Sequence, residues 1–191
     1  MPAFNPILLD LPQELTTNRL LLRPPRPGDG SVVHAAVMAT LSDLRRFPAS
    51  MIWAMSEQTL ESAEEWCRRG AAGWLLRNDF PLLVFRHGDG EHVANCGLHR
   101  FDWERRVFEI GWWCRQPHQG QGYITEAAAA VVEFAFAHLG ARRVWCFCDE
   151  QNASSWRVAE RLGFVHEGTT RSDRADPDGT RRDMRQYAVV R

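Results

Sequence analysis

Two glycines that stand one residue apart, Gly120 and Gly122, directly precede a stretch that is predicted to be helical. The stretch begins as Q-G-Q-G-Y-I-T-E-A over residues 119–127 and continues as an alanine-rich run that ends at Gly140. Glycine has no Cβ, so the backbone there can turn tightly and approach a ligand closely. The first turn of the helix adds N–H groups without intrahelical partners and the positive end of the helix dipole. The feature therefore predicts either a plain connecting turn or an anion site suited to phosphate.

Hydrophobic periodicity divides the chain into short strands and longer helices. Strands are expected over residues 20–23, 80–86, 92–100, 105–114, 143–148, 164–169 and 182–190. Helices are expected from Asp29 or Ser31 to about Thr40, from Ser56 onward, from Gly122 to Leu139 and from Asn152 to Gly163. The strands between residues 80 and 114 form a meander. The order of elements predicts an α+β fold with a mixed, mainly antiparallel central sheet of about seven strands, flanked by about four helices.

The chain is expected to consist of a short arm and one domain. Residues 1–16 are rich in proline and are predicted to be a loosely held arm, and residues 17–191 form a single domain of ordinary size. Residues 42–55 and 171–180 are expected to be irregular. The first of these segments carries many apolar side chains for a loop. It therefore either packs on the core or walls a substrate cleft.

Composition and charge narrow the class of protein. The 191 residues carry a formal net charge of -1, which gives no electrostatic case for a nucleic-acid or membrane partner. The N-terminus lacks the pattern of a signal peptide, and no apolar run approaches the roughly 20 residues that span a bilayer, so we expect a cytoplasmic protein. The five cysteines show no zinc spacing, so no metal is expected. Both a monomer and a homodimer are compatible with the sequence.

Three sequence blocks resemble one enzyme family. The block E-I-G-W-W-C-R-Q-P-H-Q-G-Q-G-Y-I-T-E-A, residues 109–127, resembles the pyrophosphate-binding motif of the GNAT acetyltransferases, and looks most like their RimJ/RimL branch. T-N-R-L-L-L-R-P (17–24) is similar to that branch's opening strand, and N-A-S-S-W-R-V-A-E-R-L-G-F (152–164) to its N-x-x-S…L-G-F helix. The blocks follow the family's order and spacing over about residues 15 to 190. One departure is Pro117, where the superfamily often has Gln or Arg.

The resemblance implies a GNAT-like fold and acetyl-CoA as co-substrate. The backbone of the strand before the glycines is implied to bond the pantetheine arm, with the N–H of Cys114 as donor to the developing oxyanion. The diphosphate is implied to rest on N–H groups of the glycine loop and on the Thr125 hydroxyl. The cofactor-binding residues implied for these two segments are Trp113, Cys114, Arg115, Gln119, Gly120, Gln121, Gly122, Tyr123 and Thr125. The loop has no lysine, which argues against a Walker-type nucleotide site.

Glu109 is the candidate general base. It lies among apolar neighbours in V-F-E-I-G-W-W, where a carboxylate is costly unless it faces a wet cleft or is paired. Related enzymes of the branch often place a glutamate here, which implies that it takes the proton of the acceptor amine, directly or through a water. The alternative is a structural glutamate at the strand edge, paired with Arg105 or Arg106.

Ser155 is the candidate for the thiol end of the reaction. In the resembling enzymes this serine replaces the tyrosine with which many GNAT proteins protonate the thiolate of coenzyme A. Asn152 is implied to contact the cofactor beside it. Both residues also fit a purely structural role, because Asn and Ser are common in the cap and first turn of a helix. His99 and His118 are weaker candidates: the first could orient the acceptor and the second could lie near phosphate.

The sequence thus predicts an acetyl-CoA-dependent N-acetyltransferase. It would move an acetyl group to a primary amine by direct attack on the thioester, with no acyl-enzyme, because no cysteine has an evident activating neighbour. The acceptor, a protein N-terminus or a small-molecule amine, is not readable from the sequence. The alternative is a non-catalytic module of the same fold that binds coenzyme A as a sensor or interaction protein.

Overall fold

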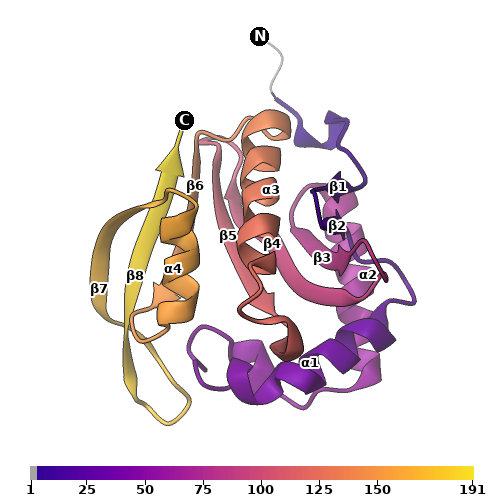
Figure 1. Ribbon diagram of the computed structural model, residues 1–191. Coiled ribbons are helices and arrows are strands. Elements are labelled where there is room, and N and C mark those ends of the chain that lie inside the picture. The colour runs from indigo at the N-terminus through magenta and orange to yellow at the C-terminus, as the bar shows by residue number, and fades with distance from the viewer. Residues whose placement is uncertain (1–3) are drawn as a thin grey trace.

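The computed structural model describes residues 4–191 and confirms the α+β fold (Figure 1). The strands are β1 (Leu15–Thr16), β2 (Leu20–Arg23), β3 (Phe80–Arg86), β4 (His92–Asp102), β5 (Val107–Cys114), β6 (Arg143–Asp149), β7 (Val165–Ala175) and β8 (Arg181–Val190). The helices are α1 (Gly30–Leu44), α2 (Leu60–Leu76), α3 (Tyr123–His138) and α4 (Ala153–Arg161). Short 3-10 turns are η1 (Pro6–Leu8), η2 (Ile52–Met55) and η3 (Gln116–His118).

Within these residues the eight strands form one sheet in the order β1-β2-β3-β4-β5-β6-β8-β7. Neighbouring strands are antiparallel except β5 and β6, which are parallel. A parallel pair needs a crossover connection, and α3 provides it. The predicted meander is β3, β4 and β5. The sheet has one strand more than expected because Leu15–Thr16 pairs with Leu21–Leu22 of β2.

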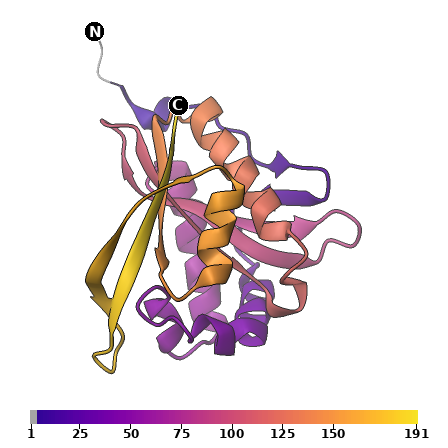
Figure 2. The ribbon, with the colours of Figure 1, turned by 60° about the vertical axis from the view of Figure 1, so that its left-hand side comes forward.

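Helices cover both faces of the sheet (Figure 2). Helices α3 and α4 pack with the larger core cluster, to which Leu82 and Val84 of β3 belong. Between them in sequence, Leu83 belongs to a second cluster with residues of α1 and α2. Because successive side chains of a strand point to opposite faces, this alternation shows that β3 is buried on both sides. The buried faces fix the register of the strands that carry the candidate site.

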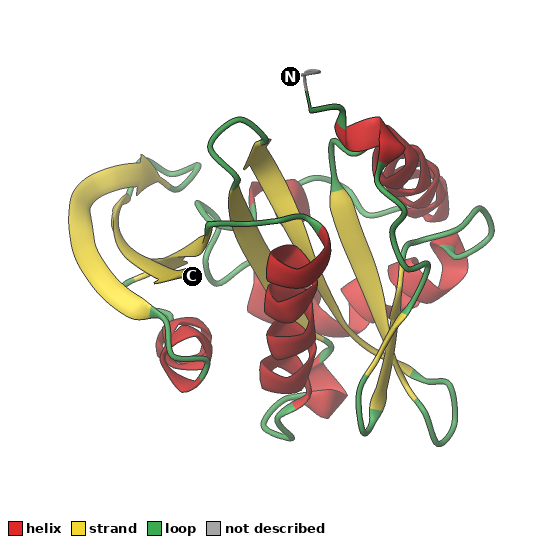
Figure 3. Cartoon of the chain, turned by 90° about the horizontal axis from the view of Figure 1, so that it is seen from above, coloured by secondary structure: helices red, strands yellow, loops and turns green. Residues whose placement is uncertain are grey.

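The central irregularity of the sheet lies between β5 and β6. These strands pair over only three positions, from Val107 with Arg143 to Glu109 with Trp145. Strand β5 continues to Cys114 beside β4, and β6 continues to Asp149 beside β8. Beyond Glu109 the two strands therefore part, and Figure 3 shows the C-terminal strands turning away from the central ones. The facing edges of β5 after Glu109 and of β6 after Trp145 are consequently unpaired in the middle of the fold.

The structure corrects the predicted start of the second helix. Ser56 does not open it; α2 begins at Leu60, after Thr59. The Thr59 side chain accepts the N–H of Ser62, and the Ser62 side chain accepts the N–H of Thr59. This reciprocal capping box satisfies two N–H groups and fixes the helix start. The residues before it include η2, so part of the segment expected to be irregular is a short 3-10 turn.

Two other predicted boundaries differ from those in the structure by four residues or more. Helix α1 extends to Leu44 rather than Thr40, and the side chain of Asp29 does not cap it but forms an ion pair with Arg23. The segment 171–180, expected to be a polar loop, is mostly hairpin, because β7 continues to Ala175. Polar residues at these positions are typical of a loop, but an exposed antiparallel hairpin also accommodates them.

The β7–β8 hairpin is tied to the segment after α1. The buried carboxylate of Asp176 accepts the N–H of Ala49 at 2.9 Å and a hydrogen bond from Nε of Arg182 at 2.6 Å. Arg174 donates to the carbonyl of Ala49 at 3.4 Å. Two segments far apart in sequence are thereby held together across the sheet.

Part of the predicted arm contacts the domain. Residues 1–3 lie outside the described part of the chain. Leu11 is buried, and Arg77 donates from Nη2 to the carbonyl of Leu9 at 2.8 Å. The division into an arm and a domain at residue 17 stays a prediction. Among residues 4–191, no helix has both the length and the apolar content needed to cross a membrane.

His92 makes the stability of this fold depend on pH. Its ring is 3% exposed and contacts Oδ1 of Asn95 at 2.7 Å through Nε2. Burial lowers its pKa from 6.5 to about 4, so the unfolded chain binds the proton more tightly than the folded chain. The stabilisation is therefore fully present above pH 6.5 and is lost as the pH falls toward 4.

We expect the wild type to lose about 3 kcal/mol more unfolding free energy than His92→Gln between pH 6.5 and pH 4. Urea unfolding at several pH values measures this difference. His87→Gln, at an exposed turn position, is the control and should follow the wild-type curve. Parallel curves for wild type and His92→Gln would contradict the assignment.

Candidate active site

A cavity of about 580 Å³ lies where β5 and β6 part. One side is formed by β5, the end of β6 and the start of α4, and the other by α1, α2 and the segment before α2. This volume lies within the range of small-molecule sites. Among the lining residues are both candidate catalytic residues, Glu109 and Ser155, together with Trp113 and Asn152. The structure thus brings together residues from two of the three sequence blocks, 109–127 and 152–164.

Glu109 is nearly buried, with 7% of its surface exposed. Its Oε1 accepts a hydrogen bond from Nη2 of Arg100 at 2.5 Å. Its Oε2 is buried and has no hydrogen-bond partner among the residues that the structure describes. The partners considered in the sequence analysis were wrong, because Arg105 pairs with Asp102 and Arg106 donates to the carbonyl of Leu139. One carboxylate oxygen is therefore held by Arg100, and the other is buried without a hydrogen-bond donor among the described residues.

Arg100 reaches Glu109 because β4 is irregular there. Its φ is +46°, in the left-handed region, and the β4–β5 register shifts between His99 and Asp102. Strict alternation would send the side chains of residues 99 and 100 to opposite faces. A bulge re-aims a side chain locally, which accounts for both residues lining the same cavity. No sequence pattern for this bulge was recognised.

Ser155 and Asn152 lie at the N-terminus of α4. The side chain of Asn152 accepts the N–H of Ser155 at 3.2 Å, so its capping role is present in the structure. The hydroxyl of Ser155 lies 3.5 Å from Sγ of Cys148 on β6. The cap holds Ser155 at the cavity wall formed by β6 and α4, while Glu109 lies on the β5 wall. A thioester placed between the two strands would meet both side chains.

The backbone of β5 narrows the predicted pantetheine contact. The N–H of Arg115 donates to the carbonyl of Val93 at 2.9 Å. In an antiparallel strand, the backbone groups of alternate residues bond to the same neighbouring strand. The backbone N–H and C=O groups of Trp113 and Arg115 therefore point to β4, whereas those of Cys114 point to the open edge. The carbonyl of Cys114 accepts only a side-chain bond, from Gln119 Nε2 at 3.4 Å. Of the three residues, Cys114 alone can offer its backbone to a ligand in the gap.

The glycine loop has the backbone geometry of an anion site. Gly120 and Gly122 have φ values of +75° and +80°, which favour glycine. The N–H of Glu126 is the first to bond within the turn of α3, to the carbonyl of Gly122 at 3.1 Å. The N–H groups of residues 123–125 therefore have no intrahelical acceptor. Residues 119–122 are exposed, so a phosphate can reach them.

Glu126 connects this loop to the beginning of the chain. Its carboxylate accepts hydrogen bonds from the Thr17 hydroxyl at 2.6 Å, from the Arg19 N–H at 3.0 Å and from Arg19 Nε at 2.6 Å. Arg19 also donates to the carbonyl of Gln121 at 3.1 Å and lies over the ring of Tyr123. Its partner Arg19 lowers the pKa of Glu126, along with the Thr17 hydroxyl, against the opposing effect of burial. The sequence analysis assigned no role to Glu126.

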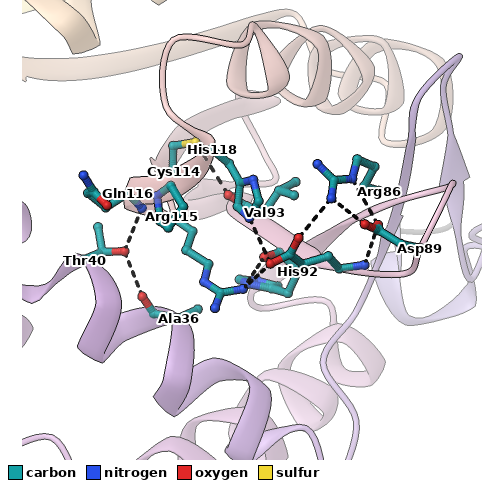
Figure 4. A network of polar contacts seen from close by, with 12 residues as sticks. Ala36, Thr40, Arg86, Asp89, His92, Val93, Cys114, Arg115, Gln116 and His118 are labelled. Atoms are coloured by element: carbon teal, nitrogen blue, oxygen red, sulfur yellow. Dashed lines mark hydrogen bonds and ion pairs between the residues drawn. The ribbon is translucent and has the colours of Figure 1, made fainter.

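A second polar network joins the segment just before the glycine loop to the turn between β3 and β4 (Figure 4). Glu91 accepts hydrogen bonds from Arg86 at 3.0 Å and Arg115 at 3.1 Å, and lies 3.2 Å from Nε2 of His118. His118 is 6% exposed, so it faces this network, and the structure gives no direct sign of the predicted phosphate contact. The hydroxyl of Thr40 accepts the N–H of Gln116, which fixes η3 against α1.

Two of the cysteines, Cys96 and Cys114, are poor nucleophiles. Burial raises the pKa of Cys114 to about 11 and the pKa of Cys96 to about 12, so both are protonated at neutral pH. The five cysteines are free. Among residues 4–191, no group of three His, Cys, Asp or Glu side chains is placed to hold a metal ion. Burial thus argues against Cys96 and Cys114 as covalent nucleophiles, whereas a hydrogen bond with Cys146 lowers the pKa of Cys148, which also lines the cavity.

Comparisons with known proteins agree with this geometry. The chain matches the family model of the acetyltransferase (GNAT) domain over residues 19–165. It is 36% identical over 97 residues to the uncharacterized N-acetyltransferase YnaD of Bacillus subtilis (strain 168), covering 49% of each chain. It is 32% identical over 87 residues to the ribosomal-protein-serine acetyltransferase of Escherichia coli (strain K12), covering 46% of this chain and 48% of the relative. The chain spans about half the length of these curated relatives.

The solved structure of RimL, a ribosomal-protein acetyltransferase in complex with coenzyme A, superposes with a TM-score of 0.83 and 21% identity over 93% of this chain and 97% of that one. This similarity shows the fold. The family model covers most of the chain, so the chain belongs to the GNAT acetyltransferase family. The GNAT family predicted from the three sequence blocks is thereby confirmed.

Gly122 allows a direct test of the loop. We expect Gly122→Ala to lower stability by about 1 kcal/mol, because an L residue is strained at φ +80°, and to weaken coenzyme A binding about tenfold. Gly140→Ala, at the other end of α3, is a matched control: its φ is +62°, and an added Cβ would lie 3.5 Å from an arginine nitrogen, as it would at Gly122. The control should lose similar stability and keep its affinity. Equal affinity losses in both variants, measured by calorimetry, would refute the loop as the binding site.

Proposed function

We propose that this protein is an acetyl-CoA-dependent N-acetyltransferase that acts on a primary amine. The observation that carries the proposal is that Glu109, on β5, and Ser155, on α4, line one cavity. That cavity opens at the gap between β5 and β6, beside the unpaired backbone of Cys114. The family membership and the coenzyme A in the RimL structure support acetyl-CoA as the co-substrate.

In the proposed reaction, the diphosphate rests on the N–H groups of residues 119–123, with the hydroxyl of Thr125 beside them. The pantetheine arm runs along the open edge of β5, and the N–H of Cys114 donates to the thioester oxygen. A preformed donor of this kind stabilises the negative charge that develops on that oxygen. Asn152 holds the start of α4 against the cofactor.

The transfer itself forms a C–N bond and breaks a C–S bond. The free amine attacks the thioester carbon, and Glu109 accepts a proton from the nitrogen as the bond forms, directly or through a water. The free Oε2 of Glu109 suits this role, since Arg100 holds the other oxygen. The hydroxyl of Ser155 donates a proton to the departing thiolate and is reprotonated from solvent, and Glu109 releases to solvent the proton that it took from the nitrogen, so that in net one proton moves from the amine to the thiol.

The charges of the cavity suit a cationic acceptor. Its lining contains four carboxylates against two guanidinium groups, namely Glu57, Asp79, Glu109 and Asp149 against Arg100 and Arg174. An excess of one sign in a cleft raises the local concentration of the opposite charge, here an ammonium group. Asp149, which is 1% exposed, was not predicted from the sequence.

The body of the acceptor would contact aromatic side chains. Trp53 and Trp66 line the cavity and are 41% and 37% exposed, and Trp53 lies 6.3 Å from Trp113, between ring centroids. For residues 42–55, the exposed Trp53 supports the interpretation as a cleft wall, while Leu44 and Ala54 are buried in the second core cluster, so the segment does both. Partly exposed tryptophans at a cavity wall suit a small-molecule amine as well as the first residues of a peptide.

The acceptor is proposed only as far as a primary amine, either a protein N-terminus or a small molecule. The names of the relatives favour a ribosomal protein for the first choice. We propose a cytoplasmic monomer or homodimer without a nucleic-acid or membrane partner. The alternative is a module that binds coenzyme A without turnover, and it gives no role to the unpaired Oε2 of Glu109.

Glu109→Gln separates the enzyme from the binding module. We expect kcat to fall at least about 100-fold, because the amide cannot accept the proton, while the dissociation constant of acetyl-CoA is unchanged. Thiol release over a panel of amines and N-terminal peptides measures the first quantity, and calorimetry the second. Glu104→Gln, on an exposed turn of the same strand pair, is the control and should behave as the wild type. Acetyl-CoA binding without thiol release in the wild type, on any acceptor, would favour the binding module.

A further inference from the structure

We propose that His99, oriented by Asp79, is a second catalytic group that takes a proton from the acceptor ammonium before the transfer. The inference rests on the proposed acetyl transfer and adds a residue pair to it. His99 ends the regular part of β4, and Asp79 directly precedes β3. Both side chains line the same cavity as Glu109.

The contact with Asp79 sets the proton arrangement of the ring. Nδ1 of His99 lies 2.6 Å from Oδ1 of Asp79. A carboxylate only accepts, so Nδ1 carries the hydrogen of this bond, and in the neutral ring Nε2 keeps a free electron pair. The hydrogen bonds of the described residues leave Nε2 without a partner. A base oriented by a carboxylate and open at its other nitrogen is thereby present in the cavity.

Two glycines hold the ring against the sheet. Gly97 and Gly111 are direct register partners on β4 and β5. A Cβ at Gly97 would lie 3.2 Å from Nε2 of His99, and a Cβ at Gly111 would lie 3.5 Å from its Cδ2. The ring therefore lies over a patch of sheet without side chains. A Cβ at Gly97 would also lie 2.6 Å from the carbonyl oxygen of Phe80, so both the neighbouring backbone and the ring restrict this position to glycine.

His99 is also placed beside the other proposed base. It is the register partner of Glu109, and directly opposed side chains on one face have Cβ atoms about 5 Å apart. Beyond this pair and Asp79, the charged or titratable side chains lining the cavity are His34 from α1, Glu57 before α2, Arg100, Asp149, Arg174 and the thiols of Cys96, Cys146 and Cys148. One nitrogen atom of an acceptor can therefore be near both His99 and Glu109.

The reaction needs two proton acceptors. At neutral pH most α-amino groups and nearly all alkyl amines are ammonium ions, with pKa values of about 8 and about 10. The first proton must leave before the nitrogen can attack, and it is released to solvent. The second leaves the nitrogen as the C–N bond forms and is balanced by the proton on the thiol of coenzyme A.

The two bases differ in their access to water. The side chains of His99 and Asp79 are 39% and 41% exposed, so a proton taken by the ring can pass to solvent. Glu109 is 7% exposed and lies deeper, next to the gap between the strands. This division assigns the first proton to His99 and the second to Glu109. Imidazole is well suited to accept and release a proton near neutral pH.

The test is the pH dependence of kcat/KM for His99→Ala with an amine that the wild type acetylates. We expect about a 100-fold loss at pH 7, because the ammonium keeps its proton. The loss should shrink as the pH rises above the pKa of the amine, since solution then supplies the free amine. Added imidazole should restore part of the activity at pH 7. Asp79→Asn should show a smaller loss with the same pH trend.

Controls separate this role from a structural one. His87→Gln, in an exposed turn, should keep the wild-type profile, and acetyl-CoA affinity should be unchanged in every variant. A loss that is the same at all pH values and is not rescued by imidazole would overturn the proposal, as would full activity of His99→Ala at pH 7. A wild type that binds acetyl-CoA but transfers nothing would instead overturn the proposed function, so the two failures are distinguishable.

Discussion

The brief parallel pairing of β5 and β6 is the constraint on which the proposed site depends. Three register positions join the strands, and the pairing ends at Glu109. The strands then separate because each follows its antiparallel partner, β4 on one side and β8 on the other. The separation exposes backbone groups of β5 and opens a cavity lined by both strands. A sheet that stayed paired to Cys114 would have no room there for a thioester.

Polar contacts hold the surroundings of this gap in place. Glu126 joins the turn before β2 to the first turn of α3. Glu91 accepts hydrogen bonds from Arg86 and Arg115 near the glycine loop. On the opposite side, Asp176 fastens the β7–β8 hairpin to the segment after α1. Each carboxylate connects segments that are distant in sequence. The loop, the gap and the cavity are consequently parts of one supported arrangement.

The sequence predicted the order of elements well because periodicity and glycines are local signals. The bounds of β2 and β3 were predicted without error, and the α4 cap by Asn152 is confirmed. The start of α2 was missed because Ser56 and Thr59 are both good caps, and only the reciprocal bond with Ser62 distinguishes them. The candidate site residues came from the family blocks, and Glu109, Asn152 and Ser155 among them line one cavity. Arg100 and Asp79 were not predicted, because a bulge and a contact across 20 positions place them.

The most direct test of the account is a crystal structure of the protein with acetyl-CoA. The account predicts the diphosphate on the N–H groups of residues 119–123, the thioester oxygen at the N–H of Cys114, and the sulfur beside the hydroxyl of Ser155. The side chain of Gln119 would leave the carbonyl of Cys114, which it contacts at 3.4 Å in the free protein. A cofactor bound elsewhere, or a β5–β6 gap closed by further strand pairing, would contradict the central claim.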